Sequence, residues 1–294
     1  MEEKYMYLGI DIGGTFIKYA LVEKDYTITK KWKKETKLCK TKDEFYDYLC
    51  EGLTELDVEC IGVSAPGVID SDSTVLSKAA RNVRIMMHHR VNEEIKSRTG
   101  IKTATMNDAK AAGYCELMIG NGKGTSSSVY FVIGTGIGGC VCDREGVIQG
   151  VNNIAGEFSN IPMGYADGKI LGLSNLASMS ALINIYNSMS ETQLTYGTEV
   201  CERYLAKEAA AVKAMDQWCL NICLGLFSIV IFYNPEVICL GGGISEEDWF
   251  IDKVRETWNG LERPFKDLTT TRIDRCLYNN DANLLGAVLY ATKH

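Results

Sequence analysis

Apolar residues along this chain follow two spacings, one typical of strands and the other typical of helices. Near the N-terminus, residues 5–10 and 16–22 are predicted strands joined by Gly13-Gly14, and 31–37 is a predicted exposed third strand. Residues 43–56 have the spacing of an amphipathic helix. The pattern then predicts a strand at 60–63, a helix at 91–98 that ends at Gly100, a strand at 101–106 and a helix at 109–118.

The second half of the chain repeats this beginning in outline. YLGIDIGGTFIKYALV near residue 7 has a looser echo in VYFVIGTGIGGCVC near residue 129, where strands at 128–133 and 140–142 flank the glycine turn 134–139. A long helix at 202–233 precedes a buried strand at 237–240. Alternating strands and helices predict an α/β fold whose sheets are covered by helices. Because no low-complexity linker separates the halves, we expect them to pack closely around a cleft.

The charge balance argues against a partner that needs a basic surface. The 294 residues include 31 Lys and Arg against 38 Asp and Glu, a net charge of −7. The first 110 residues hold 18 basic and 18 acidic residues, so the remainder carries the whole deficit. No nucleic-acid or anionic-membrane partner is therefore expected, and the basic cluster Lys30–Lys42 is interpreted as a solvated face. The most apolar stretch, 219–233, falls short of the roughly 18 unbroken apolar residues of a membrane span.

The cysteines and histidines give no metal motif. Eleven cysteines without a CxxC pair suit a reducing compartment, and we interpret them as small core residues. His88, His89 and His294 lie far from any cysteine in sequence, so a local zinc motif is absent. The start MEEKYMYLGID lacks the basic residues and the long apolar run of a signal peptide, which predicts a cytoplasmic protein.

Asp11-x-Gly13-Gly14-Thr15 carries the first candidate chemistry. Glycines between two strands let the backbone approach a phosphate, and the exposed amides of such a turn form an anion cradle. Thr15 adds a hydroxyl donor and Lys18 a cation, whereas Asp11 can hold Mg²⁺ through water. A plain β-hairpin with a Gly-Gly turn explains this sequence equally well.

Two further glycine runs follow predicted strands. Residues 134–139 match GxGxxG, but a dinucleotide site needs a helix next, and here a strand follows. Gly241-Gly242-Gly243 ends the buried strand at 237–240. No GxxxxGK[ST] occurs, so the chain has no Walker P-loop. Three glycine turns at strand ends, two of them related, predict one nucleotide held between two lobes.

Asp108 follows Asn107 where a predicted strand meets a helix. A carboxylate there can accept a proton from a substrate hydroxyl, and the helix N-terminus helps to keep it ionised. Asp and Asn are also favoured helix N-caps, and local sequence alone favours that role. Glu157 follows a Gly/Asn-rich loop and is otherwise a solvated loop carboxylate. Ser64 is not a nucleophilic serine, because Gly62-x-Ser64-x-Pro66 breaks the GxSxG pattern.

Together these residues resemble the ROK family of sugar kinases in the actin-like ATPase superfamily. The resemblance covers nearly the whole chain and rests on LGIDIGGTFIK (8–18), GVSAPGVID (62–70), MNDAKAA (106–112), VIGTGIGGCV (132–141), AGEF (155–158) and NPEVICLGGGIS (234–245). It implies two lobes of duplicated ribonuclease-H-like fold, with ATP and the sugar in the cleft between them. The expected lobes are residues 1–110, joined by the C-terminal helix 284–294, and residues 111–283.

The resemblance also implies a role for each candidate residue. Asp108 becomes the catalytic base, and Asp11 is the candidate Mg²⁺ ligand through water. A homodimer is expected from the family. The candidate ATP and phosphate residues are Gly9, Ile10, Asp11, Ile12, Gly13, Gly14, Thr15, Lys18, Gly134, Thr135, Gly136 and Gly138, with Gly241, Gly242 and Gly243 by the adenosine. The candidate sugar ligands are Ser64, Gly67, Asn107, Asp108, Glu157 and Asn160.

Two departures from the family pattern bear on the substrate. Many ROK kinases read GE-x-GH, where the histidine touches the sugar and binds zinc, but Asn160 replaces it here. The downstream cysteine motif is missing, so no zinc is expected, and Ser174 stands where a sugar-binding Glu is usual. Smaller, uncharged residues near the anomeric end would admit a glycoside. The pattern is similar to the zinc-less bacterial β-glucoside kinases, which phosphorylate the 6-hydroxyl of the non-reducing glucose in cellobiose and related glucosides.

Three alternatives to the β-glucoside prediction stay open. Glucokinase and N-acetylmannosamine kinase share the same scaffold. A non-catalytic sugar sensor is the rival from a different class, and it would bind sugar without consuming ATP. The presence of Asp108 and of both phosphate turns counts against a sensor.

Overall fold

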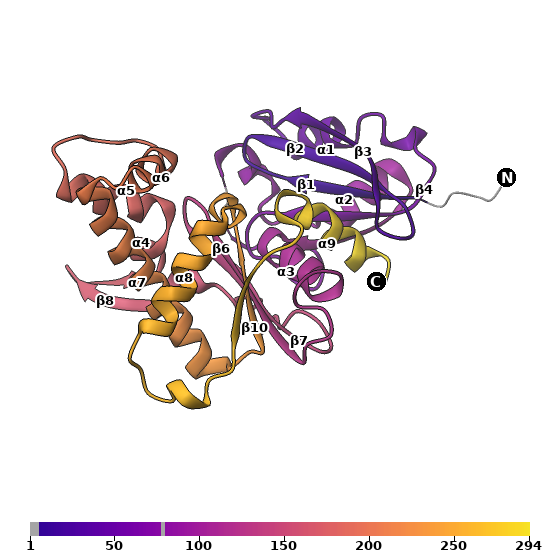
Figure 1. The fold of residues 1–294 in the computed structure, drawn as a ribbon. Coiled ribbons are helices and arrows are strands. Elements are labelled where there is room, and N and C mark those ends of the chain that lie inside the picture. Colours follow the sequence, from indigo (N-terminus) through magenta and orange to yellow (C-terminus); the bar gives the residue numbers. More distant parts are fainter. Residues whose placement is uncertain (1–5, 78–79) are drawn as a thin grey trace. The chain divides into compact units, whose positions relative to one another are not determined.

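A computed structural model describes residues 6–77 and 80–294, and the chain divides into two compact units (Figure 1). The N-terminal unit runs to Lys123 and also takes in 146–155 and 280–294. The C-terminal unit consists of 124–145 and 156–279. These units differ from the predicted lobes at 111–123, 146–155 and 280–283, and the lobe boundaries stay a prediction. Tyr5, the predicted start of the first strand, lies outside the described residues.

A five-stranded sheet forms the centre of the N-terminal unit, in the order β3-β2-β1-β4-β5. β1 pairs antiparallel with β2, which pairs antiparallel with β3, whereas β1, β4 and β5 run parallel. The strands are β1 (Met6–Ile12), β2 (Phe16–Val22), β3 (Ile28–Glu35), β4 (Val58–Ala65) and β5 (Lys102–Asn107). The helices are α1 (Lys42–Cys50), α2 (Val91–Thr99), α3 (Asp108–Met118) and α9 (Ala282–Ala291), with short 3-10 turns at Leu53–Glu55, Arg81–Met86 and Asn279–Asp281.

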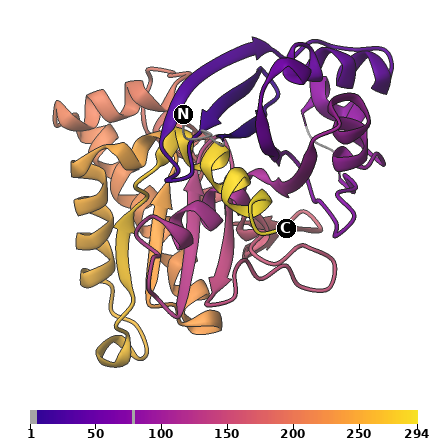
Figure 2. The ribbon, with the colours of Figure 1, turned by 90° about the vertical axis from the view of Figure 1, so that its right-hand side faces the viewer.

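Helices cover both faces of this sheet because its side chains alternate. Large apolar residues of β1 and β4, such as Leu8 and Val63, pack with α1 and α2 in one buried cluster. On the other face, Gly9 and Gly62 let the α9 backbone come close. A Cβ atom on Gly62 would lie 2.2 Å from the carbonyl oxygen of Ala287. Figure 2 shows α9 beside α3. Gly286 of α9 lies just as close to the backbone of α3 at Ala111.

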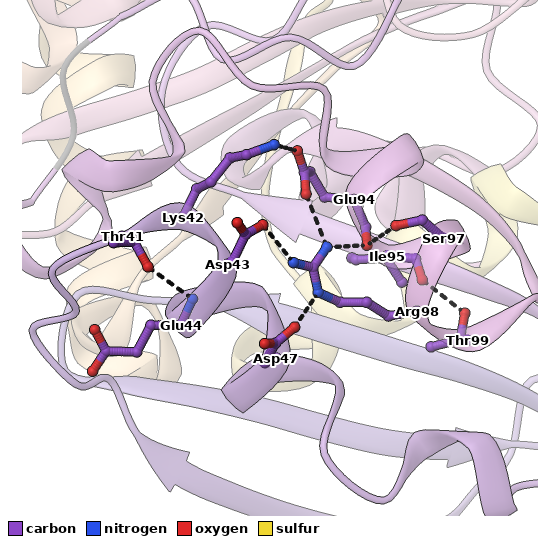
Figure 3. Close-up of polar contacts among 10 residues, drawn as sticks. All are labelled: Thr41, Lys42, Asp43, Glu44, Asp47, Glu94, Ile95, Ser97, Arg98 and Thr99. Carbon is purple, nitrogen blue, oxygen red and sulfur yellow. Dashed lines mark hydrogen bonds and ion pairs between the residues drawn. The ribbon is translucent and has the colours of Figure 1, made fainter.

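A charged network joins α1 to α2 on the N-terminal unit (Figure 3). The guanidinium of Arg98 donates to carboxylate oxygens of Asp43 at 2.9 Å, Asp47 at 2.6 Å and Glu94 at 2.8 Å. Lys42 donates to the other oxygen of Glu94. Because Glu94 is mostly buried and receives both cations, it is the centre of this network.

The C-terminal unit repeats the strand order of the first sheet without its β3 edge. β6 and β7 form an antiparallel hairpin, and β10 and β11 continue the sheet in parallel, in the order β11-β10-β6-β7. This sheet confirms the duplication that the sequence predicted. The strands are β6 (Ser127–Ile133), β7 (Ile137–Asp143), β10 (Val237–Gly241) and β11 (Arg272–Arg275), with a separate hairpin of β8 (Pro162–Ala166) and β9 (Lys169–Gly172).

Helix α7 is the core of the C-terminal unit. It buries Trp218 and Leu226, among others, in one cluster with the sheet and the neighbouring helices. α7 has the length and composition of a membrane-spanning helix, but 56% of the relevant window is buried inside the protein, as in the core helix of a globular domain. The helices are α4 (Ser174–Ala177), α5 (Met179–Met189), α6 (Gly197–Leu205), α7 (Ala209–Tyr233) and α8 (Asp248–Gly260), with 3-10 turns at Phe158–Asn160, Gly243–Glu246 and Lys266–Leu268.

Several predicted boundaries were wrong, among them that of the third strand, which covers Ile28–Glu35 and not 31–37. The helix predicted over 43–56 ends at Cys50, because Gly52 takes the left-handed conformation with φ +77°. The helix predicted over 202–233 is two helices, α6 and α7, separated at Lys207 with φ +63°. The turn predicted over 134–139 is shorter, since β7 begins at Ile137.

Candidate active site

Asp11 lies at the centre of a polar row in the N-terminal unit. Pairing of the strands sets Asp11 opposite Lys18 on β2 and Ser64 on β4. The Ser64 hydroxyl donates to Oδ1 of Asp11 at 2.8 Å, and the Lys18 ammonium lies 3.3 Å from Oδ2. Asn283 at the start of α9 also donates to Oδ1, at 3.1 Å. Asp11 is only 5% exposed, so these three donors hold its carboxylate in one orientation.

The turn after β1 is braced from outside the hairpin. Gly13 donates its amide to the carbonyl of Phe16, whereas Gly14 and Thr15 lie outside the paired register of the strands. The Thr36 hydroxyl donates to the carbonyl of Gly13 at 2.7 Å, and Asn82 donates to that of Gly14 at 3.2 Å. With its carbonyls held from one side, the turn can offer amides to an anion on the other.

Asn107 and Asp108 form a second group in this unit, at the junction of β5 and α3. Asn107 is the N-cap: its Oδ1 accepts from the amide of Lys110, and its Nδ2 donates to the carbonyl of Gly67 at 2.8 Å. Oδ1 of Asp108 accepts from Nδ2 of Asn107 at 3.0 Å and from the amide of Ala109 at 2.8 Å. The capping role that sequence allowed for Asp108 therefore belongs to Asn107, and Asp108 is the first residue of the helix.

Lys110, which sequence analysis did not single out, is buried one turn into the same helix. Its ammonium donates to Oε1 of Gln149 at 2.6 Å and to the carbonyl of Asn153 at 2.7 Å. A lysine among the alanines of 109–112 was the available signal, because a charged side chain on an apolar helix face needs a partner. Asn283 was missed as well, and its only signal was an amide at the start of an apolar helix.

The glycine turn of the C-terminal unit is held by a different set of bonds. Gly134 donates to the carbonyl of Gly136 across the turn, and its own carbonyl accepts from the amide of Met179. The amide of Ile137 donates to Oγ of Ser174 at 3.1 Å. Thr135 is exposed at the tip, and its carbonyl accepts from a serine on α5. Ser174, which the family pattern compares with a sugar-binding Glu, thus uses its hydroxyl to brace this turn.

The third glycine run follows β10 in the same unit. Gly242 has φ +95°, and a Cβ on it would lie 2.1 Å from the carbonyl oxygen of Ile133. Gly241 is packed against the Tyr130 ring, whereas a Cβ on Gly243 would meet nothing within 4 Å. Two of these glycines therefore serve the packing of the sheet, and only Gly243 offers open space to a ligand.

Glu157 precedes a short 3-10 turn over Phe158–Asn160, and Asn160 is the last residue of that turn. Phe158 is buried and stacks on Phe131, which fixes the segment against the sheet. Glu157 and Asn160 are both exposed, and the amide of Asn160 donates to the carbonyl of Glu157. The side chains of these two predicted sugar ligands thus project from a rigidly held segment.

Several predicted ATP residues have no side chain to offer a ligand. Ile10 and Ile12 are buried under α1 and α2, and Gly9 is packed against the α9 backbone. Gly138 lies within β7 rather than in the turn. These residues contribute to the shape of the sheets. The polar groups that remain for chemistry are those of the turns and the side chains of Asp11, Lys18, Asn107, Asp108, Glu157 and Asn160.

The donor sets bear on metals in two ways. Among residues 6–77 and 80–294, no three His, Cys, Asp or Glu side chains gather as a metal site would require. A single carboxylate does suit Mg²⁺, which keeps several of its waters and binds through one or two carboxylates plus substrate phosphates. Asp11 fits that description, because it is an oriented carboxylate directly before a glycine turn.

Comparison with known proteins gives the chain a family. The ROK family profile matches residues 7–294. A β-glucoside kinase of Listeria monocytogenes is 28% identical over 240 residues, covering 80% of this chain and 79% of that enzyme. An N-acetylgalactosamine kinase of a Shewanella species is 28% identical over 263 residues, covering 82% of each chain. The crystal structure of a ROK family protein from Streptococcus pneumoniae in complex with sucrose superposes with a TM-score of 0.88 at 27% identity, covering 98% of both chains.

Proposed function

Because the chain belongs to the ROK family, we propose that it is an ATP-dependent kinase that phosphorylates the 6-hydroxyl of a glucose-type sugar. The observation that carries this proposal is the geometry at the start of α3. Asn107 takes the cap and holds Gly67, so Asp108 keeps a partly exposed carboxylate at a helix N-terminus. A base held in this way is what a sugar hydroxyl needs to lose its proton.

In the proposed reaction, Asp108 accepts the proton of the sugar 6-hydroxyl. The oxygen then forms a bond to the γ-phosphorus of ATP as the bond to the β-phosphate oxygen breaks, which releases ADP. Asn107 and the amide of Ala109 both donate to Oδ1 of Asp108, so they orient the carboxylate. The proposed sugar ligands are Asn107, Glu157 and Asn160. Asn107 would act as an acceptor through Oδ1, because its Nδ2 already donates to Gly67 and to Asp108.

The phosphates require charge stabilisation, which is most of the catalytic task in phosphoryl transfer. In the N-terminal unit, the amides of Gly14 and Thr15 and the ammonium of Lys18 supply it. Asp11 would hold Mg²⁺ through water, and the bound ion neutralises phosphate charge. In the C-terminal unit, the turn at Gly134–Gly136 supplies backbone donors, and the open space at Gly243 suits the adenosine.

Among sugars, a β-glucoside such as cellobiose is the substrate we propose. It is supported by the similarity to a β-glucoside kinase and by two side chains of the C-terminal unit. Asn160 is exposed and uncharged, and Ser174 is engaged with the glycine turn, so neither places a large charged group where a glycoside would extend. The N-acetylgalactosamine kinase has the same 28% identity to this chain as the β-glucoside kinase. N-acetylgalactosamine therefore belongs in the test with glucose and N-acetylmannosamine. A homodimer remains our expectation from the family, and a cytoplasmic location remains our expectation from the sequence.

The test is ADP release from MgATP with glucose, N-acetylmannosamine, N-acetylgalactosamine, cellobiose and an aryl β-glucoside. We expect the highest kcat/KM on the glucosides. Preference for a free sugar would leave the kinase in place and remove the glucoside assignment. Binding of sugar without turnover on any of them would indicate the sensor instead.

Asp108→Asn is the decisive variant for the mechanism. It keeps the shape of the side chain and removes the base, so kcat should fall by about 10²–10⁴-fold. Asp25→Asn, at an exposed turn between β2 and β3, is the matched control and should leave kcat unchanged. A kcat close to that of the wild type in Asp108→Asn would sink the assignment of the base.

A further inference from the structure

We propose that the loop 146–155 of the N-terminal unit is the surface that contacts the group attached to the anomeric oxygen of the substrate. Val151 and Ile154 are its contact residues, and Lys110 is the positioning residue that fixes the loop. The proposal rests on the proposed function and names the part of the protein that would select a glycoside over a free sugar.

The loop runs along α3 toward the end that carries Asp108. Gly146 lies beside the Tyr114 ring, because a Cβ atom added to Gly146 would be 3.8 Å from that ring. Gln149 and Asn153 accept hydrogen bonds from Lys110, which lies four residues closer to the N-terminus of α3 than Tyr114 does. Four residues of helix correspond to roughly 6 Å along the axis. The later part of the loop therefore lies at the Asp108 end of α3, where the sugar hydroxyl would react.

The loop is also held in a defined shape. The amide of Ala155 donates to the carbonyl of Gln149, and the amide of Asn153 donates to that of Gly150. Gly150 and Asn153 both take positive φ, at +72° and +58°, as tight turns require. Because the buried ammonium of Lys110 binds two acceptors of the same loop, displacing it would leave a buried charge with fewer partners.

Two of its exposed side chains are aliphatic, although the loop is fixed. Val151 is 98% exposed and Ile154 is 58% exposed, and residues 146–155 contain no charged side chain. A rigid, uncharged loop with two aliphatic groups suits the apolar face of a second sugar or of an aryl aglycone, with Asn152 between them as a hydrogen-bonding group. An ionic ligand would find no partner among its side chains.

Val151→Ser combined with Ile154→Ser tests the contact. The readout is kcat/KM for an aryl β-glucoside divided by kcat/KM for glucose, together with the Kd of the aryl glucoside without ATP. We expect the ratio to fall by about 5- to 30-fold and the Kd to rise with it, from the lost apolar contact. Leu268→Ser removes an equally exposed aliphatic group from the C-terminal unit and should move neither value.

Gln149→Leu removes one of the two hydrogen bonds that Lys110 makes to the loop, without altering α3. Lys110→Met removes both bonds from the side of the helix. Both should raise KM for the aryl glucoside more than KM for glucose, which a general loss of stability would not do. An unchanged ratio in all three variants, with active kinase, overturns the inference and leaves the proposed function standing. A wild-type protein that phosphorylates no sugar removes the proposed function and this inference together.

Discussion

The two glycine-turn hairpins share a topology and differ in chemistry. In the N-terminal unit, β1 is flanked by β2 and β4, and the row before the turn reads Lys18–Asp11–Ser64. In the C-terminal unit, β6 is flanked by β7 and β10, and the equivalent row reads Gly138–Val132–Gly241. The same register thus places an ammonium, a carboxylate and a hydroxyl in one unit and two glycines around a valine in the other.

This difference suggests a division of labour under the proposed function. The first hairpin holds the oriented carboxylate of Asp11, which can hold a metal ion through water, and the ammonium of Lys18, which can stabilise phosphate charge. The second has no charged side chain in its row, so it would act through the backbone of its turn and the exposed Thr135, with Ser174 and Met179 bracing the turn. Duplication supplies two similar scaffolds, and only the side chains of the row decide what each turn can do.

The largest expected effect comes from neutralising the charged row. Asp11→Asn keeps the acceptor for Ser64 and removes the charge, so kcat/KM for MgATP should fall on the order of 10²-fold, as for other electrostatic groups in active sites. The Mg²⁺ concentration needed for half-maximal rate should rise in the same variant. Both are measured by ADP release over a Mg²⁺ titration.

Val132→Ala is the matched change in the second row, and it should alter kcat/KM for MgATP far less than Asp11→Asn. Equal losses in the two variants would mean that the rows do not differ in function. The midpoint of thermal unfolding of each variant is measured in parallel. Val132 is partly buried, so its truncation also has a packing cost.

A second contrast separates two neighbouring glycines of the C-terminal unit. Gly242→Ala places a Cβ against the carbonyl of Ile133 at positive φ, which should lower the free energy of unfolding by about 2–4 kcal/mol. Gly243→Ala meets open space and should change it by less than about 0.5 kcal/mol. Denaturant unfolding measures both.

The same pair of variants sharpens the nucleotide assignment. If Gly243 lies beside the adenosine, Gly243→Ala should raise KM for ATP although the protein remains as stable as the wild type. An unchanged KM would remove Gly243 from the nucleotide site and leave the third glycine run with a packing role alone.

Where a local signal fixes the backbone, sequence predicted the structure well. Gly100 ends α2 in the left-handed conformation with φ +73°, at the predicted residue. The break at Lys207 carries no glycine or proline, so apolar spacing alone joined α6 to α7. The β8–β9 hairpin was missed although Asp167-Gly168 is a strong turn signal, because its exposed strands lack the alternation that marks a half-buried sheet.

The candidate site divides in the same way. Asp11, Asn107 and Asp108 were found because each lies within a short motif. Asn283 was not found, since it reaches Asp11 from 272 residues away. Ser64 was found, but as a sugar ligand and not as the partner of Asp11, which lies 53 residues before it. Strand register and helix packing bring them together, and neither can be read from local spacing.

The smallest expected effect concerns the network between α1 and α2 (Figure 3), which contains none of the candidate site residues. Burial alone would raise the pKa of Glu94, but hydrogen bonds from Lys42 and Arg98 outweigh it and leave this pKa below its ordinary value near 4.5. A carboxylate with a lowered pKa in the folded state stabilises the protein above its unfolded pKa, and this stability is lost as the pH falls through the folded pKa.

Glu94→Gln should therefore cost about 1 kcal/mol near neutral pH, and the difference from the wild type should shrink as the pH falls from neutral to below the ordinary pKa of 4.5. Glu93→Gln, one residue earlier and paired with Arg90 at the surface, is the control and should track the wild type. Denaturant unfolding across this range measures all three proteins. A constant difference would show that Glu94 acts through packing and not through its charge. Neither variant should alter kcat/KM, since the residues of the proposed reaction lie on other elements of the unit.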